Sequence, residues 1–469
     1  MTEDLDALTR AAARAAIEHP PSPLRTDRLL ADADEALAET PADAEANAAL
    51  YFSAKGGFVP ALLGRQVRMV GQLRVGLDGR LWRYEAGVYR PDGATFVAEF
   101  CRDALRSRFR RGHVDEVLAW CRGEFPSLPE RPDPEVLNVE NGLLEWRTGT
   151  LHQHDPAVPS VVQLPVRWVP GARCPRIERF FSEILPSDAA ALAFEIAGYC
   201  LLTDQPLRRA VMALGGGRNG KSTYLGVLRA LLGPVNVASI PLQSFAESRF
   251  AAAELYGKLA NLCGDLDARA LRRSDTFKIL TGGTDAVTGE RKYGQPFSFV
   301  PFATLVFSAN EPPASSDQSD AYFDRWIVLP FERRLEEEEI DPHLLAKLTT
   351  GEELQGLLVW AVDSLRGLME RGRFDLPDSV RDAGRLYRER IDTVTAFVEE
   401  CCVVAPTVQV TRGTLYKGYR TWCVANGRLP VSNQAFGPKL RQELGGRISD
   451  GKGHRDRLWL GIGLLEEEG

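Results

Sequence analysis

The stretch ALGGGRNGKSTYLGVLRALLG, which runs from Ala213 to Gly233, decides how the rest of the chain is interpreted. An apolar strand is expected before its glycines and an amphipathic helix after them. Residues 215–222 fit the pattern G-x-x-x-x-G-K-[ST] in that strand–loop–helix setting. Glycines let backbone N–H groups approach phosphate oxygens, and the helix N-terminus adds partial positive charge. The stretch therefore predicts an α/β domain that holds the phosphates of a nucleotide.

The residues of this loop have separate expected tasks. Lys221 is expected to reach the β- and γ-phosphates and the Ser222 hydroxyl to ligate Mg²⁺, so ATP and Mg²⁺ are the predicted cofactors. A dinucleotide site on the same glycines would need an acidic residue about 20 residues further on, and none precedes Glu247. The dinucleotide alternative is therefore rejected. The predicted ATP-binding residues are Gly215, Gly216, Gly217, Arg218, Asn219, Gly220, Lys221, Ser222 and Thr223.

Composition excludes several classes of protein. The chain has 469 residues, too many for one core, with the 44% apolar and 26% charged residues of a soluble globular protein. It has neither a signal peptide nor eighteen consecutive apolar residues, which predicts a cytoplasmic protein without a membrane span. Eight cysteines without a C-x-x-C pair argue against a zinc ribbon or a disulfide framework. Residues 1–50 carry 11 acids and 4 bases, which accounts for the whole net charge of −7, so nucleic acid is not excluded as a partner.

Polar residues at strand ends are expected to complete the site. Asp265 follows an apolar strand and is predicted to share the metal ion with Ser222, with Asp267 close by. Asn310 ends the buried strand ATLVFSAN, where its amide can orient the attacking water. Arg325 directly precedes the strand in FDRWIVLPF and can stabilise transition-state charge as an arginine finger. The predicted catalytic residues are Lys221, Asp265, Asn310 and Arg325, and the predicted metal ligands are Ser222 and Asp265.

A second motif points to nucleic acid. The segment DAVTGERKYGQPFSFVP reads as two strands joined by a turn, with Arg291, Lys292 and Tyr293 near the tip. A basic side chain beside an aromatic ring suits single-stranded nucleic acid, because one group pairs with phosphate and the other stacks on a base or sugar. These three residues are the predicted DNA-binding residues.

The order of five motifs resembles that of superfamily 3 helicases. The motifs are GGGRNGKST, LANLCGDLD, KILTGGTDAVTGERKYGQPFSF, LVFSANEPP and FDRWIVLPF. The resemblance is greatest to the helicase half of phage, plasmid and poxvirus-type primase–helicases. It extends from about Phe52 to Leu465 and includes RLWRYEAGVYRPDG, LNVENGLLEW and the C-terminal LYKGYRTWCVANGRLPVSNQAFGPKLRQELG, which is similar to a winged-helix module of that family.

The resemblance implies an AAA+ ATPase that closes into a ring, usually of six subunits, and moves along single-stranded DNA from 3′ to 5′. It implies that Asn310 is the polar sensor and that Arg325 reaches the ATP of the neighbouring subunit. Lys292 and Tyr293 would lie on a hairpin that lines the central channel. Forked DNA and a separately encoded primase or loader are further implied partners, and a bacterial or phage-infected cell is the implied setting.

Two departures from the family pattern affect these expectations. Many members have two adjacent acids after the second strand, whereas Gly264 precedes Asp265 here, so the catalytic base stays open between Asp267 and Glu311. Fused members carry a primase domain of a few hundred residues upstream, and this chain has about fifty residues there. Priming is therefore not expected.

The sequence thus predicts a multidomain α/β protein and a ring-forming, ATP-dependent DNA helicase of phage or mobile-element replication. The alternative is an ATP-switched replication initiator or loader that binds DNA without processive unwinding. The predicted parts are an acidic helical leader (1–50), an N-terminal α+β domain (51–170), a helical connector or collar (171–205), the AAA+ core (206–335), a helical lid or linker (336–392) and a winged-helix-like domain for DNA or a partner (393–469).

Overall fold

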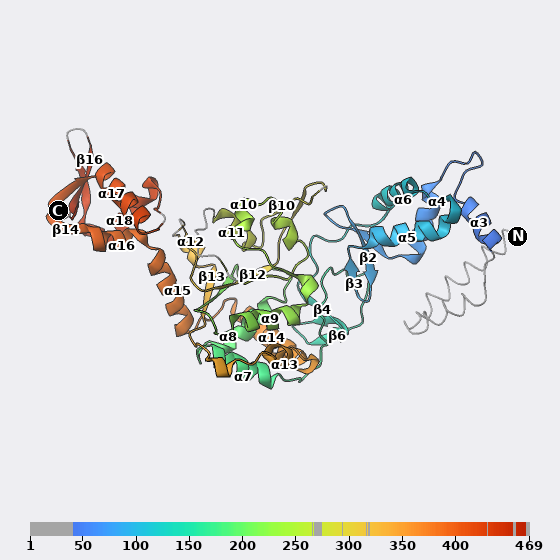
Figure 1. Cartoon of the computed structure of the whole chain (residues 1–469), viewed down its shortest axis with the longest axis horizontal. Coiled ribbons are helices and arrows are strands. Elements are labelled where there is room, and N and C mark those ends of the chain that lie inside the picture. The colour runs from blue at the N-terminus through green and yellow to red at the C-terminus, as the bar shows by residue number, and fades with distance from the viewer. Residues whose placement is uncertain are drawn as a thin grey trace. The chain divides into compact units, whose positions relative to one another are not determined.

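The computed structural model describes residues 41–264, 266, 274–292, 294–315, 317, 319–428, 430–453 and 456–465 (Figure 1). These residues form two compact units. The first unit holds residues 41–71 and Asp92–Phe125, and the second holds Gln72–Pro91 and residues 126–465. The chain therefore leaves the first unit and returns to it once. The domain bounds given above remain predictions.

The first unit is helical. Helices α4 and α6 pack so closely that a Cβ on Gly64 would lie 2.1 Å from a ring carbon of Trp120. Only glycine allows this approach. The elements are α3 (Pro41–Ala49), α4 (Pro60–Val70), α5 (Gly93–Leu105), the 3₁₀ turn η1 (Arg106–Arg108) and α6 (Arg111–Glu124).

Two small antiparallel sheets open the second unit. Alternating apolar residues around Asp78-Gly79 and Asn141-Gly142 predict two hairpins. Both hairpins form, each with a third strand added. The first sheet holds β1 (Leu73–Val75), β2 (Leu81–Glu85) and β3 (Val88–Arg90), and the second holds β4 (Val136–Val139), β5 (Gly142–Glu145) and β6 (Thr150–His152).

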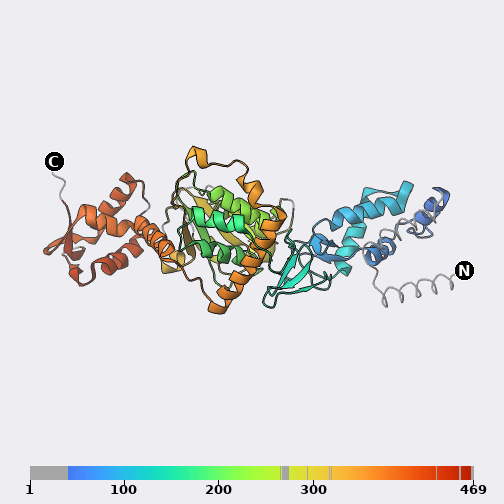
Figure 2. The same ribbon diagram turned by 90° about the horizontal axis from the view of Figure 1, so that it is seen from below.

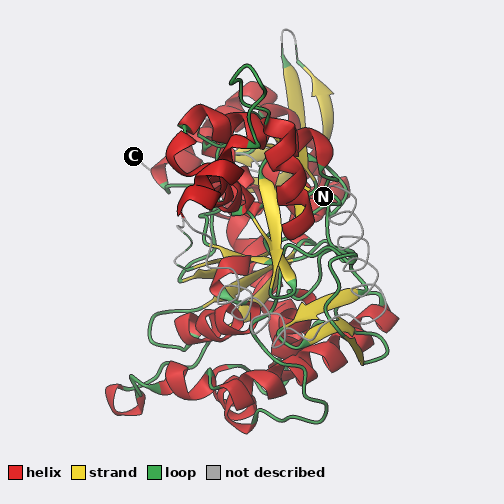
Figure 3. Cartoon of the chain, turned by 90° about the vertical axis from the view of Figure 1, so that its right-hand side faces the viewer, coloured by secondary structure: helices red, strands yellow, loops and turns green. Residues whose placement is uncertain are grey.

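A five-stranded parallel sheet forms the centre of the second unit, which confirms the α/β class (Figure 3). Its strand order is β13-β7-β12-β9-β8, so β7 lies between β12 and β13, two strands that come much later in the sequence. Every strand is short and mainly apolar, as expected for a parallel sheet covered on both faces. The strands are β7 (Ala210–Leu214), β8 (Val237–Ala238), β9 (Ala260–Cys263), β12 (Thr304–Ala309) and β13 (Trp326–Pro330).

Alternate residues of these strands enter two separate cores. Val211 and Ile327 join one core with helices that precede and follow the sheet in sequence, and Met212 and Val328 join the other. Helices α8 and α14 lie side by side in the first core (Figure 2), where a Cβ on Gly198 would lie 2.3 Å from the Ala361 carbonyl oxygen. The first core includes α7 (Pro175–Ile184), α8 (Ala190–Tyr199), α9 (Lys221–Leu232) and α14 (Gly351–Arg371), and the second includes α10 (Ser244–Glu247), α11 (Asp275–Leu280), α12 (Asp320–Phe323), α15 (Asp378–Ile391) and the hairpin β10 (Val287–Gly289) and β11 (Phe297–Phe299).

The C-terminal segment has a core of its own, built around Tyr419, Phe436 and Trp459. Its sheet order is β14-β16-β15. Strand β14 contains a proline and shifts register against β16 between Val404 and Gln409. The elements are α16 (Thr393–Cys401), β14 (Cys402–Thr411), α17 (Arg412–Ala425), α18 (Asn433–Leu444), β15 (Ser449–Lys452) and β16 (Arg457–Leu464). Over the described residues, no helix combines the length and apolarity needed to cross a bilayer.

Candidate nucleotide site and hairpin

The glycine loop connects the end of β7 to the start of α9, as predicted. Gly220 precedes the helix with φ +85°, a left-handed conformation that glycine adopts without strain. The backbone N–H of Gly215 donates to the Ala309 carbonyl oxygen (3.1 Å), which fixes the start of the loop to β12. The loop therefore lies at the carboxyl edge of the parallel sheet, where ligands bind in open α/β folds.

Lys221 is 6% exposed and its ammonium group lies inside the loop. Its Nζ donates to the carbonyl oxygens of Gly215 (2.6 Å) and Gly216 (2.9 Å), and to Asn219 Oδ1 (3.0 Å). Nζ also donates to Oδ1 of Asn310 (3.3 Å), the residue that directly follows β12. The two residues meet because β12 pairs with β7 in parallel, with Ala309 opposite Leu214. The structure thus brings together the predicted lysine and the predicted sensor.

Asn219 has a task that the sequence did not reveal. Its side chain is almost fully buried and donates from Nδ2 to the Phe331 carbonyl oxygen (3.0 Å) and to the Gly216 carbonyl oxygen. It therefore ties the loop to the end of β13 while its Oδ1 accepts from Lys221. The amide group suits this position because it donates and accepts at once.

A cavity of about 550 Å³ lies over the loop. Its volume is in the range of small-molecule sites, and its lining supplies backbone N–H groups, an ammonium group and the hydroxyls of Ser222 and Thr223. A Cβ on Gly216 or Gly217 would meet no atom within 4 Å, so this side of the loop is open to a ligand. The residues present therefore fit a nucleoside triphosphate. The lining residues are Gly217, Arg218, Asn219, Gly220, Lys221, Ser222, Thr223, Gly264, Ser308, Asn310, Leu335, Glu339, Ile340, Asp341 and Leu344.

The predicted carboxylates are only partly accounted for. Asp265 and Asp267 lie outside the described residues, but Gly264, directly before Asp265, lines the cavity. Glu311, the other candidate for the base, forms an ion pair with Arg390 of α15 (2.6 Å) and is not among the lining residues.

The sequence did not predict one segment that lines the cavity. Residues 332–344, which we call the strap, follow β13 and include the turn η4 (Glu337–Glu339). The strap contributes apolar and acidic side chains to the lining. The run of four glutamates from Glu336 was the available signal, but an acidic run in a sequence does not reveal that it borders a cavity.

Arg325 lies at the other edge of the sheet from the glycine loop. Its carbonyl oxygen accepts from Ala210 N (2.7 Å), at the start of β7, whereas the loop follows the end of that strand. The five residues of β7 span about 16 Å at 3.3 Å per residue. Burial, reinforced by the nearby Arg208, lowers the pKa of the Arg325 guanidinium. This arrangement keeps Arg325 away from the glycine loop of its own chain.

The predicted DNA-binding residues of the hairpin β10–β11 differ in how far they are buried. Arg291 is partly buried, with its Nε 3.7 Å from Asp78 Oδ2, and its guanidinium lies over the Phe297 ring (5.8 Å). The side chain of Asp78 is fully buried and also accepts from Arg80 Nε (2.5 Å). Lys292 is exposed at the turn, and Tyr293 lies outside the described residues. Arg291 therefore braces the hairpin against the β1–β2 turn, whereas the side chain of Lys292 is exposed to solvent.

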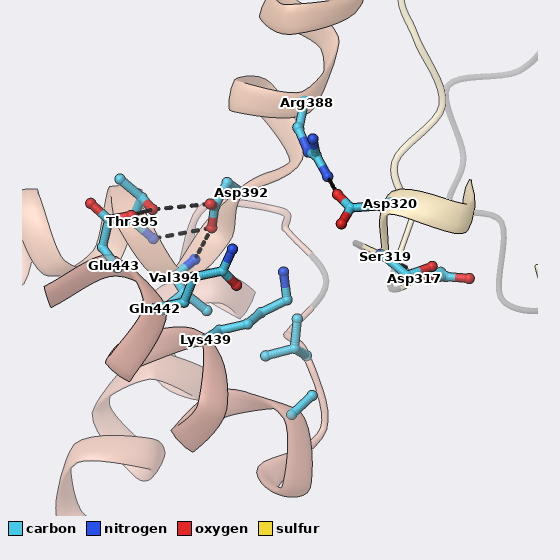
Figure 4. Close-up of a pocket in the computed structure, with 12 residues that line it drawn as sticks. Asp317, Ser319, Asp320, Arg388, Asp392, Val394, Thr395, Lys439, Gln442 and Glu443 are labelled. Carbon is cyan, nitrogen blue, oxygen red and sulfur yellow. Dashed lines mark hydrogen bonds and ion pairs between the residues drawn. The ribbon is translucent and has the colours of Figure 1, made fainter. Parts of the chain in front are cut away.

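A second cavity, of about 630 Å³, lies between the loop before α12 and helices α15, α16 and α18 (Figure 4). Arg388 pairs there with Asp320, and Asp392 caps α16 by accepting from Val394 N (3.1 Å) and Thr395 N (3.2 Å). These charged groups already hold structural partners. The smaller cavity over the glycine loop is therefore the better candidate for a nucleotide.

Three family models match separate parts of the chain. Residues 62–186 match the model described as D5 N terminal like, and residues 389–446 match the model described as Poxvirus D5 protein-like. Residues 213–325, which hold the glycine loop, Asn310 and Arg325, match a family of unknown function, DUF5906.

A viral protein is similar to part of the chain. "Putative helicase 121R" of Invertebrate iridescent virus 3 is 22% identical over 248 residues, which is 46% of this chain and 26% of that protein. The matches support a D5-type primase–helicase family. The chain spans about a quarter of the length of this curated relative.

Solved structures of the NrS-1 C-terminal region are also similar. The apo structure has a TM-score of 0.49 at 11% identity and covers 86% of this chain and 99% of its own. The A form of the apo structure has a TM-score of 0.46 at 11% identity and covers 86% of this chain and 100% of its own.

Proposed function

We propose that this D5-type protein is an ATP-dependent DNA helicase with an AAA+ core, which forms a ring, usually of six subunits. The contact between Lys221 and Asn310 carries the proposal, because a buried lysine in a glycine loop and an amide on the adjacent strand end are the parts that nucleotide hydrolysis requires. The D5-like matches and the relative named as a helicase support the DNA motor over other nucleotide hydrolases.

Within the site, each residue has one proposed task. ATP with Mg²⁺, when bound, supplies the phosphoryl group whose hydrolysis drives the motor. The loop N–H groups and Lys221 bind the phosphates, and Ser222 with Asp265 ligates the metal ion. Asn310 orients the attacking water. Asp267 stays a candidate for the base, since Glu311 is engaged by Arg390.

The ring is proposed because Arg325 needs a second copy of the chain. Its position at the opposite edge of the sheet from Lys221 lets it act on the nucleotide of a neighbouring subunit, where it stabilises transition-state charge. Such an arrangement makes hydrolysis depend on assembly. A winged-helix-like C-terminal module for duplex DNA or a loading partner completes the proposed architecture.

Coupling to DNA is proposed through the hairpin. Strand β11 ends at Phe299 and β12 begins at Thr304, so the hairpin leads through a short connection into the strand that Asn310 directly follows. A change at Asn310 can pass along β12 to Lys292 and Tyr293, which bind the single strand. The proposed direction of movement is 3′ to 5′, in phage or mobile-element replication.

Steady-state ATPase of the full chain, with and without single-stranded DNA, tests this function. The wild type should hydrolyse ATP, and single-stranded DNA should stimulate turnover. Lys221→Ala should abolish turnover, while the exposed control Lys55→Ala should leave it unchanged. Turnover near the wild-type rate in Lys221→Ala would refute the assignment of the site. ATPase that is indifferent to single strands would instead favour the initiator or loader.

A further inference from the structure

We propose that the strap forms the base-binding end of the nucleotide cavity, with Ile340 against the nucleobase. The inference rests on the proposed function and deepens it. It states which end of the cavity takes the base and which takes the phosphates.

The strap is fixed in place on both sides. Leu335 N donates to the Arg218 carbonyl oxygen in the glycine loop (2.7 Å), so the strap is in direct contact with the loop. Arg333 Nη1 donates to the Glu183 carbonyl oxygen of α7 (3.3 Å). Helix α13 (Leu344–Leu348), which begins at the last residue of the strap, packs on α9. The cavity therefore has a preformed wall at this end.

The apolar residues of the wall suit a flat aromatic base. Leu335, Ile340 and Leu344 all line the cavity, and Ile340 remains 44% exposed. Ligand sites combine apolar walls with a few polar groups that fix orientation, and here the polar groups gather on the glycine loop. A base lying on Ile340 would remove its apolar surface from water, which is favourable.

The charges of the strap exclude the triphosphate from this end. Asp341 accepts from Lys347 Nζ (2.5 Å) and from His343 N (2.9 Å), and these hydrogen bonds lower the pKa of its carboxyl. Glu339 accepts from Glu336 N (3.0 Å) and pairs with Arg333, which likewise lowers its pKa. Two carboxylates on the strap, and Lys221 with the backbone N–H groups on the glycine loop, give the cavity a polarity. The phosphates must lie on the loop and the base on the strap.

Binding of two probes to the full-length protein tests the assignment: Mg-ATP, and inorganic tripolyphosphate with Mg²⁺, which has the phosphates but no base. Ile340→Ala should weaken ATP about tenfold, the effect of trimming an apolar pocket wall. The same variant should bind tripolyphosphate as the wild type does, within twofold. Because Ile340 is half-exposed, its truncation should leave the fold intact. Leu386→Ala, which shortens a 58% exposed side chain on α15, is the matched control and should change neither affinity.

Each remaining outcome overturns the assignment. Unchanged ATP affinity in Ile340→Ala would mean that the base lies elsewhere. Equal weakening of both probes would mean that Ile340 supports the glycine loop rather than the base. If the wild type binds neither probe, the proposed function fails first, and the base assignment fails with it.

Discussion

Gly215 is the position where one added methyl group should most damage the candidate site. A Cβ there would lie 2.2 Å from the Phe331 carbonyl oxygen and 2.6 Å from Asn219 Nδ2. The Phe331 oxygen is held by Asn219 Nδ2, which donates to it (3.0 Å), and the backbone on its N-terminal side is held by the hydrogen bond from Phe331 N to the Leu214 carbonyl oxygen (2.7 Å). Gly215→Ala must therefore displace the loop from the end of β13.

The size of the effect follows from two losses. Overpacking of this kind costs about 1–3 kcal/mol. Displacement of Asn219 breaks its hydrogen bond to Phe331, which adds about 1 kcal/mol. Each kcal/mol lowers the melting temperature of a domain of 150–250 residues by about 2–4 °C, and the low end of that range applies because the second unit is larger. We expect Gly215→Ala to lower the melting temperature by roughly 4–8 °C and to weaken binding of Mg-ATP.

Gly217→Ala is the matched comparison. A Cβ on Gly217 meets no atom within 4 Å, so the free energy of unfolding should change by no more than about 0.5 kcal/mol. The added methyl group faces the cavity, however, and should hinder the approach of phosphates. Thermal melts of both variants with and without Mg-ATP separate the two effects. The reasoning is wrong if Gly215→Ala melts within 1 °C of the wild type, or if Gly217→Ala is the less stable variant.

Three further predictions concern the motor. Asn310→Ala removes an acceptor of Lys221 and the proposed water-orienting group, so ATP turnover should fall roughly 10²-fold, and an unchanged rate would contradict the role. Arg325→Ala should reduce ATP turnover about 10³-fold. If Arg325 acts between subunits, mixing this variant with Lys221→Ala should restore part of the ATPase activity. Mixtures that are no more active than the separate variants would exclude a role between subunits. Asp78→Asn weakens the ion pair that fixes Arg291 to the β1–β2 turn. The DNA concentration for half-maximal stimulation of the ATPase should therefore rise several-fold, while ATPase without DNA stays within twofold of the wild-type rate. The control Glu85→Gln breaks an ion pair with Arg83 and should match the wild type in both assays.

The candidate site shows how far the sequence alone could go. The glycine loop, its flanking strand and helix, and Asn310 at a strand end were all predicted, because each depends on residues close together in the chain. The pattern at Asp78-Gly79 predicted a hairpin for the same reason. Asp265 and Tyr293 stay predictions, since they lie outside the described residues.

What the sequence determined, then, was local: backbone conformations that glycine permits, apolar periodicity and the polar residues that end strands. Only the tertiary structure decided that Arg291 lies beside Asp78, that the strap borders the cavity, and that Arg325 lies at the far edge of the sheet from Lys221. These relations depend on the strand order β13-β7-β12-β9-β8, which brings distant segments together. The free energy of packing two apolar faces of one sheet selects that order, and no short stretch of the chain contains it.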